Sequence, residues 1–264
     1  MTYLTETFAI IGKPLSGSFS SRLFNRYFSR NEIDAVYLPF EIDEDMLQYV
    51  KSAFRDTVTG FNVTSPFKEA AFRMCDDLDE VARSTLSVNL VTVHEGKFMG
   101  FNSDVYGFTY LMQKSGLSGF PERTVILGSG GASRSVRFSL QSLFPESRIE
   151  ILGRGSGTSS DSITPYSLFR GTCNVIISTI PFQYQVEMMS TFSRVLRIGQ
   201  PDLFVDLVYN PPVTPFIKEA VKAGMRSLNG LDMFLGQAVK AFQRWFDITP
   251  DPEDLRRLIG ADKE

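Results

Sequence analysis

The sequence is poor in the residues that build metal sites and disulfide scaffolds. Its 264 residues include two cysteines, Cys75 and Cys173, and one histidine, His94. The cysteines lie far apart without metal-ligand spacing, so we expect them to act as small apolar residues in a reducing cytosol. No Cys/His cluster offers a metal site. His94 falls in an expected hairpin, where we predict a structural or exposed side chain rather than a catalytic one.

Long apolar runs and a large excess of one charge are also missing. No apolar run approaches the length that spans a bilayer, and residues 1–6 lack the basic-then-apolar layout of a signal peptide. The 27 basic and 30 acidic residues give a net charge of −3, which leaves no broad basic surface for nucleic acid. We therefore expect a cytoplasmic protein, monomer or homodimer, with neither nucleic acid nor membrane as a partner.

What the sequence does contain is typical of a folded α/β chain. Hydrophobic residues make up 43%, and the length suits one large domain or two modest ones. The 23 phenylalanines, against one tryptophan, are dispersed along the chain, and core packing explains them.

Strand and helix patterns alternate through the first hundred residues. Expected strands are 8–11, 35–40 and 60–64, with helices at 21–28 and 46–54 between them. A hairpin of 87–93 and 97–101 around Glu95-Gly96 follows, so the first domain should be α/β with a mixed sheet.

The pattern restarts after a turn-rich break at 116–121. A helix at 104–114 precedes the break, and strands are expected at 124–127, 148–152, 174–178, 203–208 and 226–228. Helices are expected at 133–140, 217–223, 234–246 and 253–258. The helix at 234–246 has no sheet of its own, so we infer that it packs back on the first domain or on the boundary.

A glycine loop follows the strand at 124–127 and precedes a helix; it reads Gly128-Ser129-Gly130-Gly131-Ala132. Glycines let the backbone approach a pyrophosphate, and the helix N-terminus adds N–H donors and a favourable dipole. A tight turn without a ligand is the alternative. The strand–loop–helix context favours a dinucleotide site, because three glycines in four positions weaken a helix start.

The next strand, 148–152, ends in Gly153-Arg154-Gly155-Ser156, where a dinucleotide fold meets the adenosine ribose. An acidic residue there would bind the 2′-hydroxyl of NAD, whereas arginine suits the 2′-phosphate of NADP. Arg154 therefore favours NADP, although it could also be a solvated loop arginine.

Polar residues also stand at several other strand ends and loops. In residues 60–68, Asn62 and Thr64 end a strand, Pro66 turns the chain, and Lys68 begins a helix. Each residue has an ordinary explanation when taken singly, such as a turn, a solvated lysine or a helix cap. The others are Ser18, Ser20, Asn89, Asp104, Tyr209 and Gln237.

Together and in this order, these residues resemble the shikimate dehydrogenase family, from about residue 8 to residue 246. The ordered set is far more specific than any member of it. The matched pieces are Gly12, Ser18, Ser20, Asn62-Val63-Thr64, Pro66, Lys68, Asn89, Gly100, Asn102-Ser103-Asp104, the glycine loop, Asp206, Val208-Tyr209-Asn210-Pro211, Gly230, Met233 and Gln237.

The resemblance implies an α/β fold with an N-terminal substrate domain, residues 1–103 completed by 231–264, and a Rossmann-type NADP domain, residues 104–230. It implies reversible hydride transfer between NADP(H) and the C3 position of shikimate or 3-dehydroshikimate, in aromatic amino acid biosynthesis. It assigns catalysis to Lys68 and Asp104. Substrate contacts would be Ser18, Ser20, Asn62, Thr64, Asn89, Tyr209 and Gln237. Cofactor contacts would be Gly128, Ser129, Gly130, Gly131, Ala132, Arg154, Thr179, Gly230 and Met233.

Several positions depart from the family pattern and bear mainly on cofactor preference. They are Gly17, Ser21, Gly153-Arg154-Gly155, Ser178-Thr179-Ile180 and Asp232. Two alternatives therefore stay open: a quinate/shikimate dehydrogenase paralogue with NAD or dual cofactor use, and a non-catalytic NADP-binding regulatory protein. The retained Lys68 and Asp104 argue against the second, because a binding module needs no proton donor.

Overall fold

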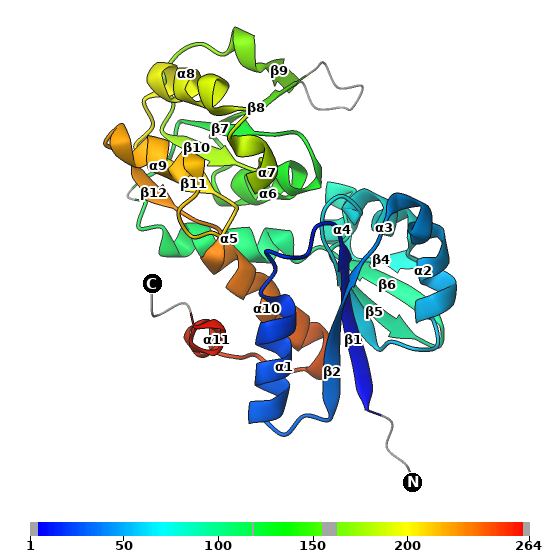
Figure 1. The fold of residues 1–264 in the computed structure, drawn as a ribbon. Coiled ribbons are helices and arrows are strands. Elements are labelled where there is room, and N and C mark those ends of the chain that lie inside the picture. Colours follow the sequence, from blue (N-terminus) through cyan, green and yellow to red (C-terminus); the bar gives the residue numbers. More distant parts are fainter. Residues whose placement is uncertain (1–4, 118, 155–162, 261–264) are drawn as a thin grey trace. The chain divides into compact units, whose positions relative to one another are not determined.

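The structure is a computed structural model that describes residues 5–117, 119–154 and 163–260. It confirms the alternation of strands and helices (Figure 1). The chain divides into two compact units: unit 1 is Met1–Ser103 with Leu235–Glu264, and unit 2 is Asp104–Phe234. In the described ranges each unit contains one six-stranded sheet.

The sheet of unit 1 is mixed, as predicted. Strand β1 pairs in parallel with β2 and β3, β3 pairs antiparallel with β5, and β5 and β6 form the expected hairpin. The sheet order is β2-β1-β3-β5-β6-β4. The strands are β1 (Glu6–Gly12), β2 (Ala35–Glu41), β3 (Gly60–Val63), β4 (Asp77–Leu78), β5 (Leu90–His94) and β6 (Lys97–Phe101).

Aromatic side chains pack α1 and α10 on this sheet. Trp245 of α10 packs on Phe8 of β1 with ring centroids 4.7 Å apart, and Phe242 lies 4.8 Å from Phe24 of α1. The indole N–H of Trp245 donates to Val91 O at 3.1 Å, which satisfies its polar atom in the core. The helices are α1 (Ser20–Arg30), α2 (Leu47–Phe54), α3 (Lys68–Met74), α4 (Glu80–Thr85), α10 (Leu231–Phe246, whose first four residues belong to unit 2) and α11 (Pro252–Ile259).

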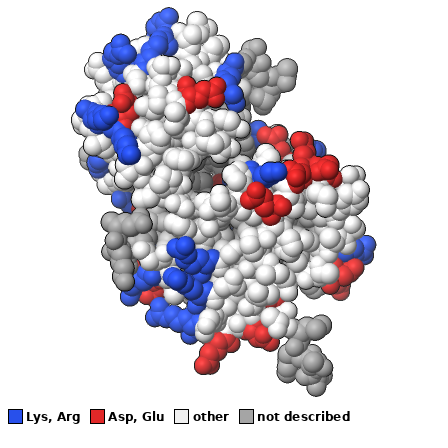
Figure 2. Space-filling model, viewed as in Figure 1, with Lys and Arg blue, Asp and Glu red and all other residues white. Residues whose placement is uncertain are grey.

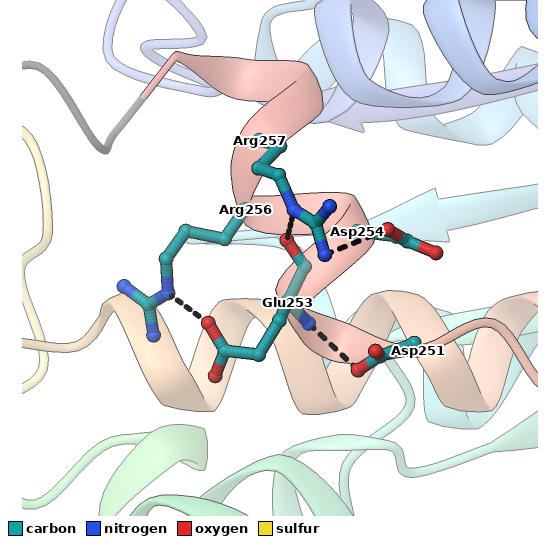
Figure 3. Close-up of polar contacts among 5 residues, drawn as sticks. All are labelled: Asp251, Glu253, Asp254, Arg256 and Arg257. Atoms are coloured by element: carbon teal, nitrogen blue, oxygen red, sulfur yellow. Dashed lines mark hydrogen bonds and ion pairs between the residues drawn. The ribbon is translucent and has the colours of Figure 1, made fainter.

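The last helix, α11, carries two ion pairs and a side-chain cap at its N-terminus (Figure 3). Asp251 accepts from Glu253 N at 3.0 Å, while Arg256 and Arg257 pair with Glu253 and Asp254, each at 3.0 Å. At the other end, Arg26 of α1 donates to Leu258 O at 2.6 Å. Lys and Arg side chains gather over α1 and α11 on the face shown in Figure 2.

The sheet of unit 2 is entirely parallel, in the order β12-β11-β10-β7-β8-β9. Its strands are β7 (Arg123–Leu127), β8 (Arg148–Gly153), β9 (Ile163–Pro165), β10 (Val175–Ser178), β11 (Leu203–Asp206) and β12 (Arg226–Leu228). Alternate residues enter two apolar clusters, Val125 with Ile176 and Ile126 with Ile177, so both faces are covered. The helices are α5 (Asp104–Lys114), α6 (Gly131–Leu143), α7 (Phe182–Gln185), α8 (Met189–Gly199) and α9 (Pro215–Lys222).

Some predicted boundaries were wrong. Helix α6 begins at Gly131 rather than 133, and α10 begins at Leu231 rather than 234. Strand β11 ends at Asp206 rather than 208, because Val208 N–H donates to the Asp206 side chain instead of a neighbouring strand. Strands β4 and β9 and helices α4, α7 and α8 were not predicted. Across the described ranges, none of the helices has the length and apolar character needed to cross a membrane.

Candidate functional site

In unit 1, two loops carrying predicted site residues lie side by side at the ends of β1 and β3. Thr64 N–H donates to Ile11 O at 2.9 Å, and Lys13 N–H donates to Ser65 O at 3.0 Å. Gly12 makes this approach possible, because a methyl group at that position would collide with the Thr64 side chain. The β1–α1 loop is therefore fixed against the β3–α3 loop.

Ser18 and Ser20 are brought together at the start of α1. Their hydroxyl oxygens lie 3.1 Å apart, and Ser20 N–H donates to Ser18 Oγ at 3.2 Å. Ser20 is the first residue of α1 and is buried, while Ser18 is half-buried. Two adjacent hydroxyls of this kind suit a carboxylate, which accepts from both.

Asn62 and Asn89 are also brought together. Asn62 Nδ2 donates to Asn89 O at 3.1 Å, and Tyr37 OH donates to Asn62 Oδ1 at 2.7 Å. A main-chain carbonyl only accepts, so Asn89 O fixes which way the Asn62 amide faces. Asn89 Oδ1 in turn accepts from Ser103 N–H at 2.7 Å and from Ser103 Oγ at 3.1 Å. This chain of bonds orders both amides.

Lys68 and Asp104 each begin a helix. Lys68 is the half-buried first residue of α3, and its main-chain oxygen accepts from Val88 N–H at 3.0 Å. The helix dipole disfavours a cation at an N-terminus, so helix stability does not explain a lysine there. Asp104 is the first residue of α5 and is completely buried. Burying a carboxyl group is costly, which points to a role that needs it.

In unit 2, the glycine loop follows β7, the strand from which successive strands are added first on one side and then on the other. After β8 and β9 the chain returns to the opposite side of β7, so the crevice between the ends of β7 and β10 is a topological switch point. Gly128 has φ +105°, and a side chain there would collide with Thr179 Oγ1. Thr179 Oγ1 donates to Leu127 O at 2.9 Å. Gly128 and Thr179 thus meet at the switch point.

The start of α6 fits the pyrophosphate of a dinucleotide. Gly130 is the N-cap residue and supplies no side-chain cap, and a methyl group on it would meet only open space. The first-turn N–H groups of α6 therefore have no side-chain acceptor from their cap. Ser133 Oγ in the same turn is buried and has no hydrogen-bond partner among the described residues. Ser129 and Gly130 are exposed, whereas Gly131 and Ala132 are half-buried.

The end of β8 fits the 2′-phosphate of NADP. Arg154 directly follows β8 and is exposed, and its guanidinium lies 5.9 Å from the centre of the Tyr184 ring. A guanidinium over an aromatic ring stays charged, and its N–H groups, which point outward in its own plane, can still donate to a phosphate. Gly155, which was predicted to flank it, lies outside the described residues.

Tyr209 lies in the loop after β11. Gly230 directly precedes α10, and Met233 lies in its first turn. The Tyr209 ring stacks on Phe234 with centroids 4.9 Å apart. Gly230 N–H donates to Val208 O at 3.1 Å, and a methyl group on Gly230 would lie 2.6 Å from the Leu207 carbonyl carbon. Met233 is buried in an apolar cluster of unit 2. Gln237, further along α10, is half-buried and belongs to unit 1.

Changing Gly230 to alanine is expected to push the Tyr209 loop away from its place. The added methyl group meets main-chain atoms, which cannot rotate aside, so we expect the free energy of unfolding to fall by about 1–3 kcal/mol. Urea denaturation measures this. Ser227→Ala, which removes only a 3.4 Å contact to Met225 O, is the control and should behave like the unchanged protein. Equal stability of Gly230→Ala and the control would contradict the expectation.

The two cysteines are free and do not provide reactive groups. Burial raises the pKa of both the Cys75 and the Cys173 thiol to about 12, so neither is a thiolate at neutral pH. His94 ends β5 and is exposed. Within the described ranges, no group of three His, Cys, Asp or Glu side chains is arranged to hold a metal ion.

Sequence reasoning missed several residues near these loops. Gln185 and Thr214 are fully buried beside Asp206, and Tyr184 lies under Arg154. Of these residues, only Asp206 could be found from the sequence, because it begins the stretch up to Pro211 that matches the family pattern. Gln185 and Thr214 are ordinary polar residues in the sequence, and only the folded loops bring them to Asp206.

Comparison with known proteins gives one family. The family model described as the shikimate dehydrogenase substrate binding domain matches residues 10–91, and the shikimate 5′-dehydrogenase C-terminal domain matches residues 230–259. A shikimate dehydrogenase (NADP(+)) of Thermoplasma acidophilum is 34% identical over 253 residues, which cover 92% of this chain and 91% of the relative.

Solved structures agree on the fold. Shikimate dehydrogenase 1 of Peptoclostridium difficile has a TM-score of 0.85 at 24% identity and covers 98% of both chains. The shikimate 5-dehydrogenase of Thermus thermophilus, solved in complex with NADP(H) and shikimate, has a TM-score of 0.78 at 24% identity over 97% of this chain and 99% of that one.

Proposed function

Because the chain belongs to the shikimate dehydrogenase family, we propose that it catalyses the reversible, NADP-dependent reduction of 3-dehydroshikimate to shikimate. The observation that carries this proposal is the likeness to a named NADP-dependent relative over 92% of the chain. The reaction would make the protein an oxidoreductase of aromatic amino acid biosynthesis, with a small molecule as its substrate. We place it in the cytoplasm, where its two free thiols stay reduced.

Within this proposal, residues 1–103 with 231–264 form the substrate domain and residues 104–230 form the NADP domain. The open start of α6 and the Ser133 hydroxyl, which has no hydrogen-bond partner among the described residues, support pyrophosphate binding at residues 128–132. Arg154 supports binding of a 2′-phosphate. Thr179, Gly230 and Met233 complete the proposed cofactor contacts. NADPH supplies the hydride when it is bound.

Lys68 and Asp104 are the proposed catalytic residues. Reduction of a ketone places negative charge on the C3 oxygen, and the Lys68 ammonium stabilises that charge and donates the proton. Asp104 orients Lys68 and keeps a proton path available. In the oxidation direction Lys68 accepts the proton from the C3 hydroxyl.

The remaining polar residues are proposed to bind the carboxylate and hydroxyl groups of the substrate. The adjacent hydroxyls of Ser18 and Ser20 donate to its carboxylate. Asn62 and Asn89, already ordered by Tyr37 and Ser103, bind hydroxyl groups together with Thr64, Tyr209 and Gln237. A site built to bond each hydroxyl discriminates strongly against an analogue that lacks one, because a buried partner is then left unpaired.

One steady-state assay tests the proposal by crossing shikimate and quinate with NADP and NAD. We expect shikimate with NADP to give the highest kcat/KM of the four pairs. Turnover of quinate, or equal use of NAD, would identify the paralogue instead. Cofactor binding without turnover of either substrate would identify a non-catalytic NADP-binding protein.

A further inference from the structure

A buried carboxyl group lies below the Tyr209 loop and takes part in none of the steps above. Asp206 is the last residue of β11 and is completely buried. Thr214 Oγ1 donates to it at 2.6 Å, Gln185 Nε2 at 2.8 Å and Val208 N–H at 3.3 Å, and the Ser178 side chain also hydrogen-bonds it. All four donors are neutral, so in the described part of the chain the carboxylate is solvated by hydrogen bonds rather than by a counter-ion.

The donors come from two separate loops at the same edge of the sheet. Ser178 ends β10, where its Oγ accepts from Ile180 N–H at 3.3 Å. Gln185 ends α7 and uses its Nε2 group for both Asp206 and Ile180 O, the latter at 3.3 Å. Its Oε1 then accepts from Phe216 N–H at 3.4 Å. A carboxylate only accepts, so Asp206 sets the orientation of the Gln185 amide and ties the loop after β10 to α9.

The same carboxylate holds both ends of segment 208–214. Val208 N–H, next to Tyr209, is bonded at one end, and Thr214 is bonded at the other. Thr214 also caps α9 by accepting from Ile217 N–H at 3.1 Å. Tyr209 therefore projects from a segment anchored at both ends on Asp206, with its ring stacked on Phe234.

We propose that Asp206 is a positioning residue for substrate binding, which holds the Tyr209 loop in its binding conformation and locks it to the loop that carries Thr179. This inference rests on the proposed function, because it takes Tyr209 as a contact to shikimate. Asp206 acts through Tyr209 and does not touch the substrate.

The protonation state of Asp206 should make substrate binding depend on pH if the residue has this role. Burial raises the pKa of its carboxyl to about 6, against the lowering effect of the four hydrogen bonds. The charged residues of α9 do not face it: Lys218 and Lys222 are exposed, and Glu219 accepts from Ser193. A proton on the carboxyl turns one accepting position into a donor and removes the negative charge. The bonds from Gln185 Nε2 and Val208 N–H, which can only donate, therefore weaken below about pH 6. The folded form binds this proton more tightly than the unfolded chain, so through this group acid loosens the loop without lowering global stability.

The test compares Asp206→Asn with the unchanged enzyme. Asparagine keeps the shape but turns an amide N–H₂ toward one of the donors. We expect the KM for shikimate at pH 8 to rise about tenfold or more, as for a lost charge-assisted hydrogen bond, with the KM for NADP changing less. The ratio of kcat/KM of the unchanged enzyme to that of Asp206→Asn should fall toward one as the pH falls from 8 to 5, because both enzymes then have a neutral group at this position. Asp202→Asn, an exposed carboxyl just before the same strand, is the matched control and should leave all constants unchanged.

Two results would overturn the inference: an unchanged KM for shikimate, or a ratio that stays constant from pH 5 to pH 8. If Asp206→Asn does not fold, Thr214→Val and Thr214→Ser replace it. The valine variant loses the bond to Asp206 and should show the raised KM, whereas the serine variant keeps the hydroxyl and should not. An unchanged enzyme without shikimate-dependent NADPH formation would instead refute the proposed function.

Discussion

Changing Lys68 to alanine is expected to lower kcat by a factor of about 10²–10⁴ while cofactor affinity stays nearly unchanged. The proposed role of Lys68 is to stabilise charge on the C3 oxygen and to transfer a proton, and both effects belong to the chemical step. The glycine loop and Arg154, which are the proposed cofactor contacts, are left intact. Steady-state kcat measures the first effect, and titration with NADPH fluorescence measures the second.

Lys97→Ala is the matched control for this change. Lys97 is an exposed lysine of the same unit, at the start of β6, and has no proposed contact to substrate. Its removal should leave kcat within the error of the unchanged enzyme. Survival of full activity in Lys68→Ala would show that the catalytic assignment is wrong, even if the protein proves to be a shikimate dehydrogenase.

Changing Arg154 to alanine is expected to raise the KM for NADP by about 10- to 100-fold and to leave the KM for NAD unchanged. A hydrogen bond to a charged group contributes about 1.5–3 kcal/mol, and each 1.4 kcal/mol corresponds to a factor of ten. NAD lacks the 2′-phosphate, so the loss of Arg154 removes none of its contacts. Steady-state kinetics with each cofactor at saturating shikimate measure the two constants.

Arg148 provides the control for the cofactor experiment. It is exposed and begins the same strand, β8, at the end opposite Arg154. Arg148→Ala should change neither constant. A parallel loss of affinity for NADP and NAD in Arg154→Ala would mean that the guanidinium contacts a part common to both cofactors, and the 2′-phosphate assignment would fail.

The elements with strong periodicity could be predicted from the sequence. The strands around Phe8, Val125 and Ile176 are short apolar runs bounded by glycine or polar residues, and their shortness and these boundaries favour a strand over a helix. The glycine loop was placed correctly between a strand and a helix. The mixed sheet of unit 1 followed from the hairpin around Gly96, and β5 and β6 confirm it.

What could not be predicted depends on contacts between distant segments. Two- and three-residue strands such as β4 and β9 have no room for a periodic pattern. The end of β11 at Asp206 is set by a side chain that bonds Val208 N–H, which no local pattern encodes. Gly230 looked like a motif glycine, whereas its close approach to the Leu207 carbonyl is visible only in the folded chain.

Trp245 makes the two units spectroscopically distinguishable. It is the single tryptophan of the chain, and it lies in unit 1, with its ring 4.7 Å from Phe8 and its indole N–H bonded to Val91 O. Intrinsic emission on selective tryptophan excitation therefore reports the unfolding of unit 1 alone, whereas far-ultraviolet circular dichroism reports both units. Coincidence of the two denaturation curves would mean that the units unfold as one cooperative body, and an earlier or later emission change would give the stability of unit 1 without any added label.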